Sequence, residues 1–108
     1  MNYGITTKEM KERLTNQIKA NTGIDAEVSV GIRDVEYNAT HRLYDVSVYF
    51  KFGRSEYKAE RCDDGSYFCN KISGMNSSIR NEKGQDYFDE FEDLINCLKA
   101  TKGKGYRL

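Results

Sequence analysis

The chain of 108 residues contains no proline, no tryptophan and a single histidine, His41. Without proline, a long extended linker is not expected, and the chain should be compact throughout. This length suits one domain with one core, so we expect a single domain over residues 1–108. The formal net charge is zero. The chain therefore lacks the overall positive field that nucleic-acid-binding proteins usually carry.

Long apolar runs are also missing. No stretch approaches the roughly 20 apolar residues that a helix needs to span a bilayer. The first residues, 1–11, are polar and lack the apolar core of a signal peptide. The three cysteines, Cys62, Cys69 and Cys97, are an odd number at irregular spacing, which argues against a secreted disulfide framework. We therefore expect a soluble protein of the cytoplasm.

Catalytic and metal-binding motifs are absent as well. No pair of cysteines or histidines has the spacing of a zinc site, and we expect no metal and no cofactor. Nucleophilic catalysis needs a base beside the nucleophile, and the one histidine lies in a predicted loop. We therefore expect that the protein is not an enzyme. A small-ligand binder or enzyme that uses a pocket between helices and sheet stays open as a third possibility.

The strongest structural signal is the alternation over residues 42–52, which predicts the central strand of a sheet. One face of this strand is β-branched or aromatic, as suits a half-buried surface. These inward residues are Tyr44, Val46, Val48, Phe50 and Phe52. A similar alternation over residues 26–32 predicts the strand before it.

Two turn signals predict hairpins after the central strand. Gly53-Arg54 has the form of a two-residue type II′ turn and pairs residues 50 and 57, 49 and 58, and 48 and 59. Asp64-Gly65 predicts a second two-residue turn between strands over residues 55–62 and 67–73. With that turn, Arg61 faces Phe68 on the inner side, and Cys62 and Cys69 point outward. Residues 74–84 are predicted to form an irregular loop.

Amphipathic helices are predicted at both ends of the chain. Thr6 and Glu9 form a capping-box pattern before the apolar stripe Met10, Leu14 and Ile18, and Gly23 ends that helix. The second helix is predicted over residues 85–100. The basic, glycine-spaced residues 102–108 are predicted to form a frayed tail.

Together these elements predict a two-layer α+β domain of order αββββα. Its sheet is a four-stranded antiparallel meander, and two helices cover one face of it.

The first candidate contact surface is acidic. The predicted second helix begins with a run of acids around an aromatic residue, and we expect these residues to bind a basic partner: Asp86, Tyr87, Asp89, Glu90 and Asp93. Exposed acids and a tyrosine anchor are features of such contacts. The alternative is that the acids only complement the dipole of the helix that carries them.

The second candidate surface is the open face of the sheet. The predicted register places Tyr49, Lys58, Tyr67 and Lys71 on it, and tyrosine is enriched at interface hot spots. The alternative is that an antiparallel sheet with one covered face simply shows polar residues to water.

In order of elements the chain resembles the double-stranded RNA-binding domain, which also runs helix, antiparallel strands, helix. In that family the second helix begins with lysines that grip phosphates. Here the corresponding position reads Gln85-Asp86-Tyr87-Phe88-Asp89-Glu90, and the predicted sheet has one strand more. A small RNA- or DNA-binding domain, carried by the basic residues 99–107 with Lys58 and Lys71, is therefore the second functional hypothesis.

In general character the chain resembles the small anti-CRISPR-like inhibitors that phages use against bacterial defence systems. The shared features are brevity, a proline-free composition without catalytic residues, and an acidic aromatic segment. The resemblance implies a non-enzymatic, protein-binding inhibitor in the host-cell cytoplasm. Its partner would be a nuclease or another basic protein that handles nucleic acid, and direct nucleic-acid binding is less expected.

Overall fold

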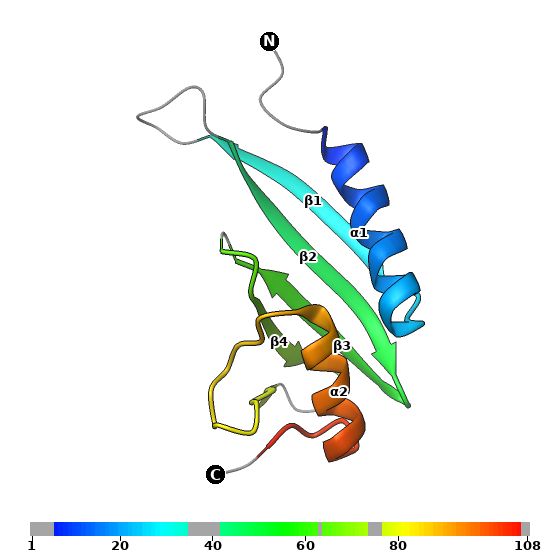
Figure 1. The fold of residues 1–108 in the computed structure, drawn as a ribbon, viewed down its shortest axis with the longest axis vertical. Coiled ribbons are helices and arrows are strands. Elements are labelled where there is room, and N and C mark those ends of the chain that lie inside the picture. Colours follow the sequence, from blue (N-terminus) through cyan, green and yellow to red (C-terminus); the bar gives the residue numbers. More distant parts are fainter. Residues whose placement is uncertain (1–5, 35–41, 63, 74–76, 107–108) are drawn as a thin grey trace.

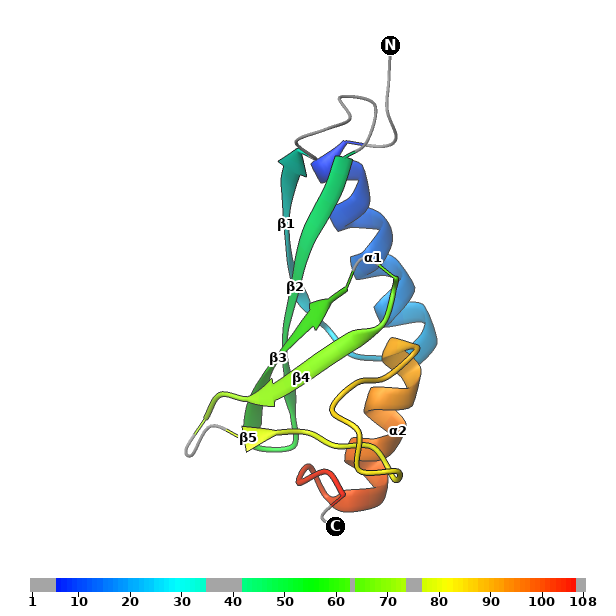
Figure 2. The same ribbon diagram turned by 90° about the vertical axis from the view of Figure 1, so that its left-hand side faces the viewer.

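The computed structural model describes residues 6–34, 42–62, 64–73 and 77–106. The elements run α1 (Thr7–Thr22), β1 (Glu27–Asp34), β2 (Arg42–Phe52), β3 (Ser55–Arg61), β4 (Tyr67–Lys71), β5 (Ser77–Ser78) and α2 (Phe91–Thr101). The strands form one antiparallel sheet in the order β1-β2-β3-β4-β5. Both helices lie on the same face of this sheet (Figures 1 and 2). The predicted two-layer α+β architecture is confirmed, and the short β5 is added inside the predicted 74–84 loop.

The ends of α1 follow the predicted capping pattern. The side-chain oxygen of Thr6 accepts a hydrogen bond of 3.1 Å from the backbone N–H of Glu9. Gly23 takes the left-handed conformation at φ 75° and donates its N–H to the carbonyl of Lys19 at 2.9 Å. Between these ends, Leu14 and Ile18 are buried against the sheet. The helix thus forms where its caps and its apolar stripe coincide.

The β2–β3 hairpin has the predicted register. Phe50 pairs with Tyr57, Tyr49 with Lys58, and Val48 with Ala59. Gly53 has a positive φ of 63°, as the first residue of the predicted turn requires. Five inward residues of the two strands are at most 4% exposed and form the centre of the core: Val46, Val48, Phe50, Tyr57 and Ala59.

The β3–β4 hairpin differs from the prediction by one residue. Its loop is closed by Cys62 and Ser66, whose backbone groups are 2.7 Å apart, and not by a two-residue turn. Asp64 stabilises this longer loop by accepting hydrogen bonds from the N–H and the hydroxyl of Ser66, at 2.9 and 2.6 Å. A left-handed glycine, Gly65 at φ 91°, completes it, as is common in three-residue hairpin loops.

This shift turns every side chain of β4 to the opposite face. Arg61 pairs with Tyr67 and not with Phe68. Tyr67 and Cys69, both predicted to face outward, are buried at 5% and 1% exposure, whereas Phe68 is 42% exposed.

Aromatic rings join α2 to the sheet. Phe50 stacks on Tyr57 with a centroid distance of 5.4 Å, and Phe91 meets Phe50 and Tyr67 edge-on at 5.3 and 5.6 Å. Such pairs contribute roughly 0.5–1.5 kcal/mol beyond the burial of their area. Phe91, the first residue of α2, therefore packs the start of the helix against the aromatic part of the core.

The predicted frayed tail is packed over residues 102–106. Gly103 and Gly105 are buried. Tyr57 donates its hydroxyl to the carbonyl of Gly103 at 2.7 Å, and the N–H of Tyr106 reaches the carbonyl of Arg80 at 3.0 Å. The prediction was wrong because the glycines serve close packing: a Cβ on Gly105 would lie 2.9 Å from the backbone nitrogen of Arg80. Residues 107 and 108 lie outside the described part of the chain.

Candidate functional site: an acidic groove beside the second helix

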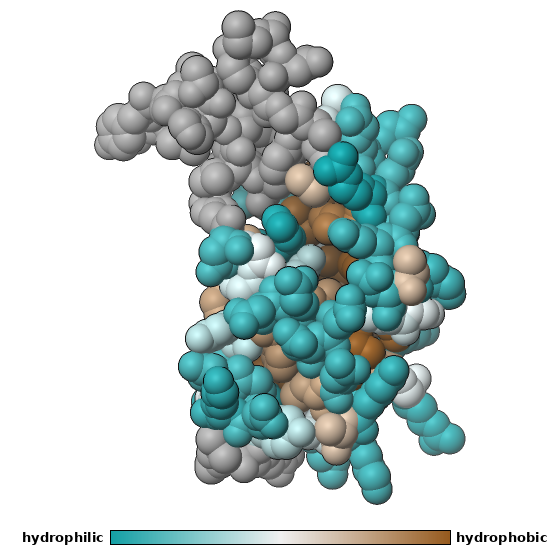
Figure 3. Space-filling model, viewed as in Figure 1, coloured by the Kyte–Doolittle hydropathy of each residue, from teal (hydrophilic) through white to brown (hydrophobic). Residues whose placement is uncertain are grey.

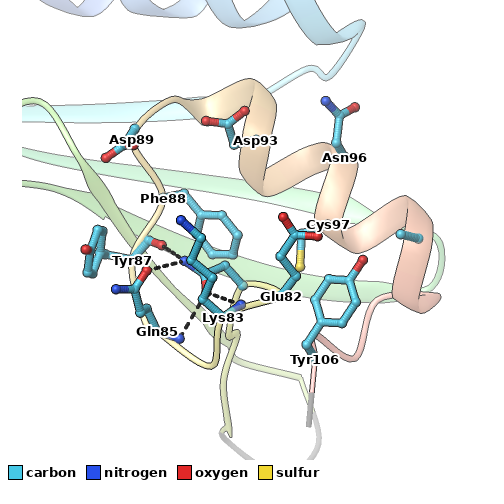
Figure 4. A pocket seen from close by; sticks show the side chains of 12 residues that line it. Glu82, Lys83, Gln85, Tyr87, Phe88, Asp89, Asp93, Asn96, Cys97 and Tyr106 are labelled. Carbon is cyan, nitrogen blue, oxygen red and sulfur yellow. Dashed lines mark hydrogen bonds between the residues drawn. The ribbon is translucent and has the colours of Figure 1, made fainter. Parts of the chain in front are cut away.

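A groove of about 600 Å³ lies between α2 and the segment that precedes it, as Figure 4 shows. The tail closes one side of it with Tyr106. Polar and acidic side chains dominate its lining: Asn81, Glu82, Lys83, Gln85, Tyr87, Phe88, Asp89, Asp93, Asn96, Cys97, Ala100 and Tyr106. We call this site the acidic groove.

Asn81 builds the outer wall of the acidic groove. Its side-chain oxygen accepts hydrogen bonds from the N–H groups of Lys83 and Gln85, at 2.9 and 3.0 Å. Its side-chain nitrogen donates to the carbonyl of Tyr87 and to the side chain of Gln85, both at 3.1 Å. Gly84, at φ 79°, closes the turn by donating to the carbonyl of Asn81 at 2.9 Å. One side chain therefore organises the whole turn.

Phe88 positions the aromatic and acidic residues on either side of it. Its backbone N–H and carbonyl exchange hydrogen bonds of 2.9 and 2.8 Å with Tyr67 at the edge of β4. Its side chain is buried, whereas the neighbouring Tyr87 is 38% exposed and Asp89 is exposed. Because the segment is extended, Tyr87 and Asp89 lie on the opposite side of the chain from Phe88. Both belong to the lining of the groove, and in Figure 4 their side chains project away from α2.

The same bridge corrects the predicted helix. The helix expected to begin at Gln85 begins at Phe91, because the backbone of Phe88 pairs with β4 and cannot also make helical hydrogen bonds. Glu90 is the N-cap, and its N–H donates to the carboxylate of Asp93 at 3.3 Å. Asp86 and Asp89 are therefore not on the helix, and they cannot act as first-turn acids of it.

Three of the five predicted acidic-segment residues line the acidic groove: Tyr87, Asp89 and Asp93. Asp86 is exposed nearby but is not part of its lining. Glu90 lines a second, smaller cavity of about 190 Å³ between the two helices, next to Arg61 and Tyr67. This smaller cavity lies between the helices and the sheet, where a ligand pocket was considered.

Electrostatically the acidic groove favours a cation. Glu82, Asp89 and Asp93 contribute carboxylates, and among the described residues that line it Lys83 is the one basic side chain. Tyr87 and Tyr106 add rings whose faces attract positive charge. The arrangement suits a lysine or arginine side chain of a partner better than an anion.

Cys97 lies in the wall of the acidic groove but is a poor nucleophile. It is buried, and its Sγ lies 3.4 Å from the backbone carbonyl of Arg80. Burial raises the pKa of the Cys97 thiol, which keeps it protonated at neutral pH. The reactive form of cysteine is the thiolate, so this environment does not activate it.

Only two of the four contact residues predicted for the open sheet face, Tyr49 and Lys58, lie together on it. Tyr49 and Lys58 are cross-strand neighbours, with the Lys58 ammonium 5.7 Å from the centre of the Tyr49 ring. Tyr67 is in the core and packs on Phe91. Lys71 is half-buried opposite Tyr57 and does not stand beside Lys58. The one-residue shift of β4 explains both corrections, and the contact set predicted for this face is not assembled.

Several residues of the acidic groove were not predicted. Asn81 could have been found, because with Gly84 it forms an Asn-x-x-Gly sequence, a common turn pattern. Glu82, Asn96 and Tyr106 could not, since only the packed tail and the late start of α2 bring them to the same groove.

Basic residues gather elsewhere. Lys99, Lys102 and Lys104 are exposed on the last turn of α2 and in the tail. Within residues 6–34, 42–62, 64–73 and 77–106, no group of three or more His, Cys, Asp or Glu side chains is placed to hold a metal ion. His41 lies outside these residues. Neither helix of the described chain is long and apolar enough to cross a membrane.

Comparisons with protein-family models, with curated proteins and with solved structures found no significant match. The acidic groove is thus characterised by its own geometry and charge.

Proposed function

We propose that this chain is a non-enzymatic, protein-binding inhibitor that docks its acidic groove onto a basic partner protein. The observation that carries the proposal is the lining of the groove. Three carboxylates and two tyrosines surround a concave site that holds one lysine. A basic side chain inserted there would meet opposite charge and aromatic faces at once.

The groove is also preorganised, which favours binding over a loose electrostatic attraction. The Asn81 hydrogen bonds fix its outer wall, and the Tyr67–Phe88 bridge fixes its base. Little conformational freedom would therefore be lost when a partner binds.

The partner is proposed to be a basic protein that handles nucleic acid, because such proteins present lysine and arginine in clefts that receive phosphates. An acidic groove would compete for those side chains. This step follows the resemblance in general character to anti-CRISPR-like inhibitors, and the comparisons neither support nor oppose it. Direct RNA binding is the weaker alternative, since the start of α2 carries Glu90, Glu92 and Asp93.

The experiment reverses charge inside and outside the groove by the same amount. The groove variant combines Glu82→Lys and Asp89→Lys, two exposed residues whose side chains make no hydrogen bond to the described part of the chain. The control combines Glu12→Lys and Glu27→Lys, two exposed residues on α1 and β1. Both variants gain the same net charge, so a difference between them reports position and not overall field.

Binding is measured with an immobilised arginine-rich peptide and with a short RNA duplex as two separate probes. Inhibition is measured as loss of DNA cleavage by purified RNA-guided nucleases. We expect the parent and the control to bind the peptide, with an affinity that falls as salt rises, and the groove variant to lose this binding.

A sheet-face variant, Tyr49→Ala with Lys58→Ala, separates the two candidate surfaces. If that variant loses peptide binding and the groove variant keeps it, the acidic groove is not the contact surface. Tight binding of the RNA duplex by the parent would instead favour the nucleic-acid-binding alternative.

A further inference from the structure

The two sides of the sheet differ in how far their outer backbone groups are paired. The outer edge of β4 is covered, because Asn70 and Lys71 pair with β5, Ile79 donates its N–H to Cys69 at 2.9 Å, and Phe88 pairs with Tyr67. At the other edge, β1 pairs with β2 alone among the described strands. Every second residue of β1 therefore directs its backbone N–H and carbonyl away from the sheet.

The edge of β1 lacks three of the features that commonly block strand addition, namely a bulge, a proline and a lysine. Its eight residues pair with β2 in unbroken register from Glu27–Tyr49 to Asp34–Arg42, so no bulge interrupts it. The strand Glu-Val-Ser-Val-Gly-Ile-Arg-Asp contains no proline and no lysine. The charged residues of β1, Glu27, Arg33 and Asp34, lie at its two ends, and residues 28–32 between them are uncharged. Among the described residues, this middle part is open to a further strand.

One flank of α1 overhangs this open edge. The helix packs mainly on β1, and it lies along the outer side of the sheet in Figure 1. Its opposite flank faces α2, because Gln17 and Asn21 line the small cavity together with Phe91. The helical period of 3.6 residues then places a lysine- and threonine-rich flank above the edge. That flank consists of Thr7, Lys8, Lys11, Thr15 and Lys19.

The flank is free to take a partner at its N-terminal half. Lys8 and Lys11 are exposed and make no ion pair with the described residues, whereas Lys19 pairs with Asp25 at 3.0 Å. Figure 3 shows hydrophilic side chains along the outer side of α1. Glu9 lies off this flank at the helical period, and Glu12, one turn after Lys8, borders the flank on the side away from the sheet.

We propose that the edge of β1 and the lysine flank of α1 form a docking site for an extended acidic segment of another protein. The segment adds to the sheet as a strand beside β1, and main-chain hydrogen bonds supply the affinity. Its acidic side chains on the helix side contact Lys8 and Lys11, and this pairing selects an acidic segment over a basic one. This site lies apart from the acidic groove and accepts the opposite charge.

A second copy of the chain is the competing occupant, and a mass measurement distinguishes the two. Pairing β1 with β1 of a second copy would require two α1 helices to lie next to each other over the same edge. The overhang of α1 opposes this, because packed helices need 8–10 Å between their axes. We therefore expect the protein to remain monomeric in sedimentation at concentrations up to about 100 µM, and a dimer that depends on β1 would overturn the proposal.

The direct test uses a synthetic peptide of about eight residues that alternates aspartate or glutamate with valine and threonine. We expect it to bind the full chain, and a peptide with lysine at the acidic positions to bind at least about tenfold more weakly. The most discriminating test is methylation of alternate backbone nitrogens of the acidic peptide. Methyl groups on the nitrogens facing β1 should abolish binding, and methyl groups on the other nitrogens should not.

Matched protein variants identify the flank. Lys8→Glu with Lys11→Glu should weaken binding of the acidic peptide by about tenfold or more. Arg13→Glu with Lys104→Glu, which lie away from the edge, should leave it unchanged. Equal binding by both variants, no effect of either methylation pattern, or no binding of the acidic peptide at about 1 mM would each overturn the proposal.

Discussion

The hydroxyl of Tyr57, on the central strand β3, donates a buried hydrogen bond of 2.7 Å to the backbone carbonyl of Gly103. Tyr57 is 1% exposed, so this contact links the middle of the sheet to the tail that follows α2. Burial also raises the pKa of Tyr57, so the phenol stays protonated and able to donate at neutral pH. The tail is therefore part of the core, although it carries no secondary structure after α2.

Replacing Tyr57 with phenylalanine should destabilise the fold by roughly 1–3 kcal/mol, because the buried carbonyl of Gly103 loses its partner. Urea unfolding measures this loss. Tyr49→Phe is the matched control, since Tyr49 is exposed on the open sheet face and should tolerate the same change. Equal unfolding midpoints for the two variants would mean that the hydrogen bond contributes nothing to stability.

Replacing Gly105 with alanine should destabilise the protein more than replacing Gly23. Both glycines have a left-handed φ, 76° and 75°, so each change strains the backbone by roughly 1–2 kcal/mol. A Cβ at Gly23 would have nothing within 4 Å, whereas one at Gly105 would lie 2.9 Å from the backbone nitrogen of Arg80. The close approach should add roughly 1–3 kcal/mol, as overpacked sites do.

Thermal melts of the two variants provide the comparison, because the shared backbone term cancels between them. If Gly105→Ala melts at the same temperature as Gly23→Ala, the tail shifts to accommodate the added Cβ at no cost in stability.

Stability should fall in alkaline solution partly through Cys69. Burial raises the pKa of the Cys69 thiol to about 12, from its ordinary value of 9.0. Below pH 9 the thiol is protonated in both the folded and the unfolded chain, so its contribution to stability is fully present. Between pH 9 and about 12 the unfolded chain loses the proton while the folded chain keeps it. Each pH unit in this window should then favour unfolding by roughly 1.4 kcal/mol for this thiol.

Urea unfolding at several pH values in that window measures the effect. Cys69→Ala should show a shallower decline than the parent, and Cys62→Ala, at a half-buried position in the β3–β4 loop, should follow the parent. Buried Tyr57 and Tyr67 add to the decline above pH 10 in all three proteins, since burial raises the pKa of both. A parent-like slope in Cys69→Ala would contradict the prediction.

The sheet could be predicted from the sequence where turn chemistry and side-chain alternation agree. The β2–β3 register follows from Gly53-Arg54, and the alternation of Val48 and Phe50 gives the same answer. The β3–β4 register could not be predicted, because Asp63-Asp64-Gly65 suits a loop of either length. Tyr67 and Phe68 are adjacent aromatics, so hydrophobicity did not decide which of them faces the core.

The candidate site was predictable only in part for a similar reason. Phe88 and Phe91 have helical spacing, which extended the predicted helix too far toward the N-terminus. A long-range backbone bridge to Tyr67 overrides that local pattern. Tyr87, Asp89 and Asp93 were predicted as contact residues because the segment that contains them is unusually rich in acidic residues. Asn96 and Tyr106 joined them only through tertiary packing that no local pattern reports.

The outer wall of the acidic groove leaves β4 at Ile79 and returns to it at Phe88. Both attachment points lie on one strand, at Cys69 and Tyr67, and the turn between them is held by Asn81. The segment is a loop whose two ends are both anchored to one strand, as the hypervariable loops of an antibody are anchored to its β-sandwich. Because Asn81 holds the turn through the backbone N–H groups of Lys83 and Gln85, the exposed side chains of Glu82, Lys83 and Asp86 can be exchanged without removing these hydrogen bonds. The specificity of the groove can thus be redesigned on one side while α2 keeps the other side in place.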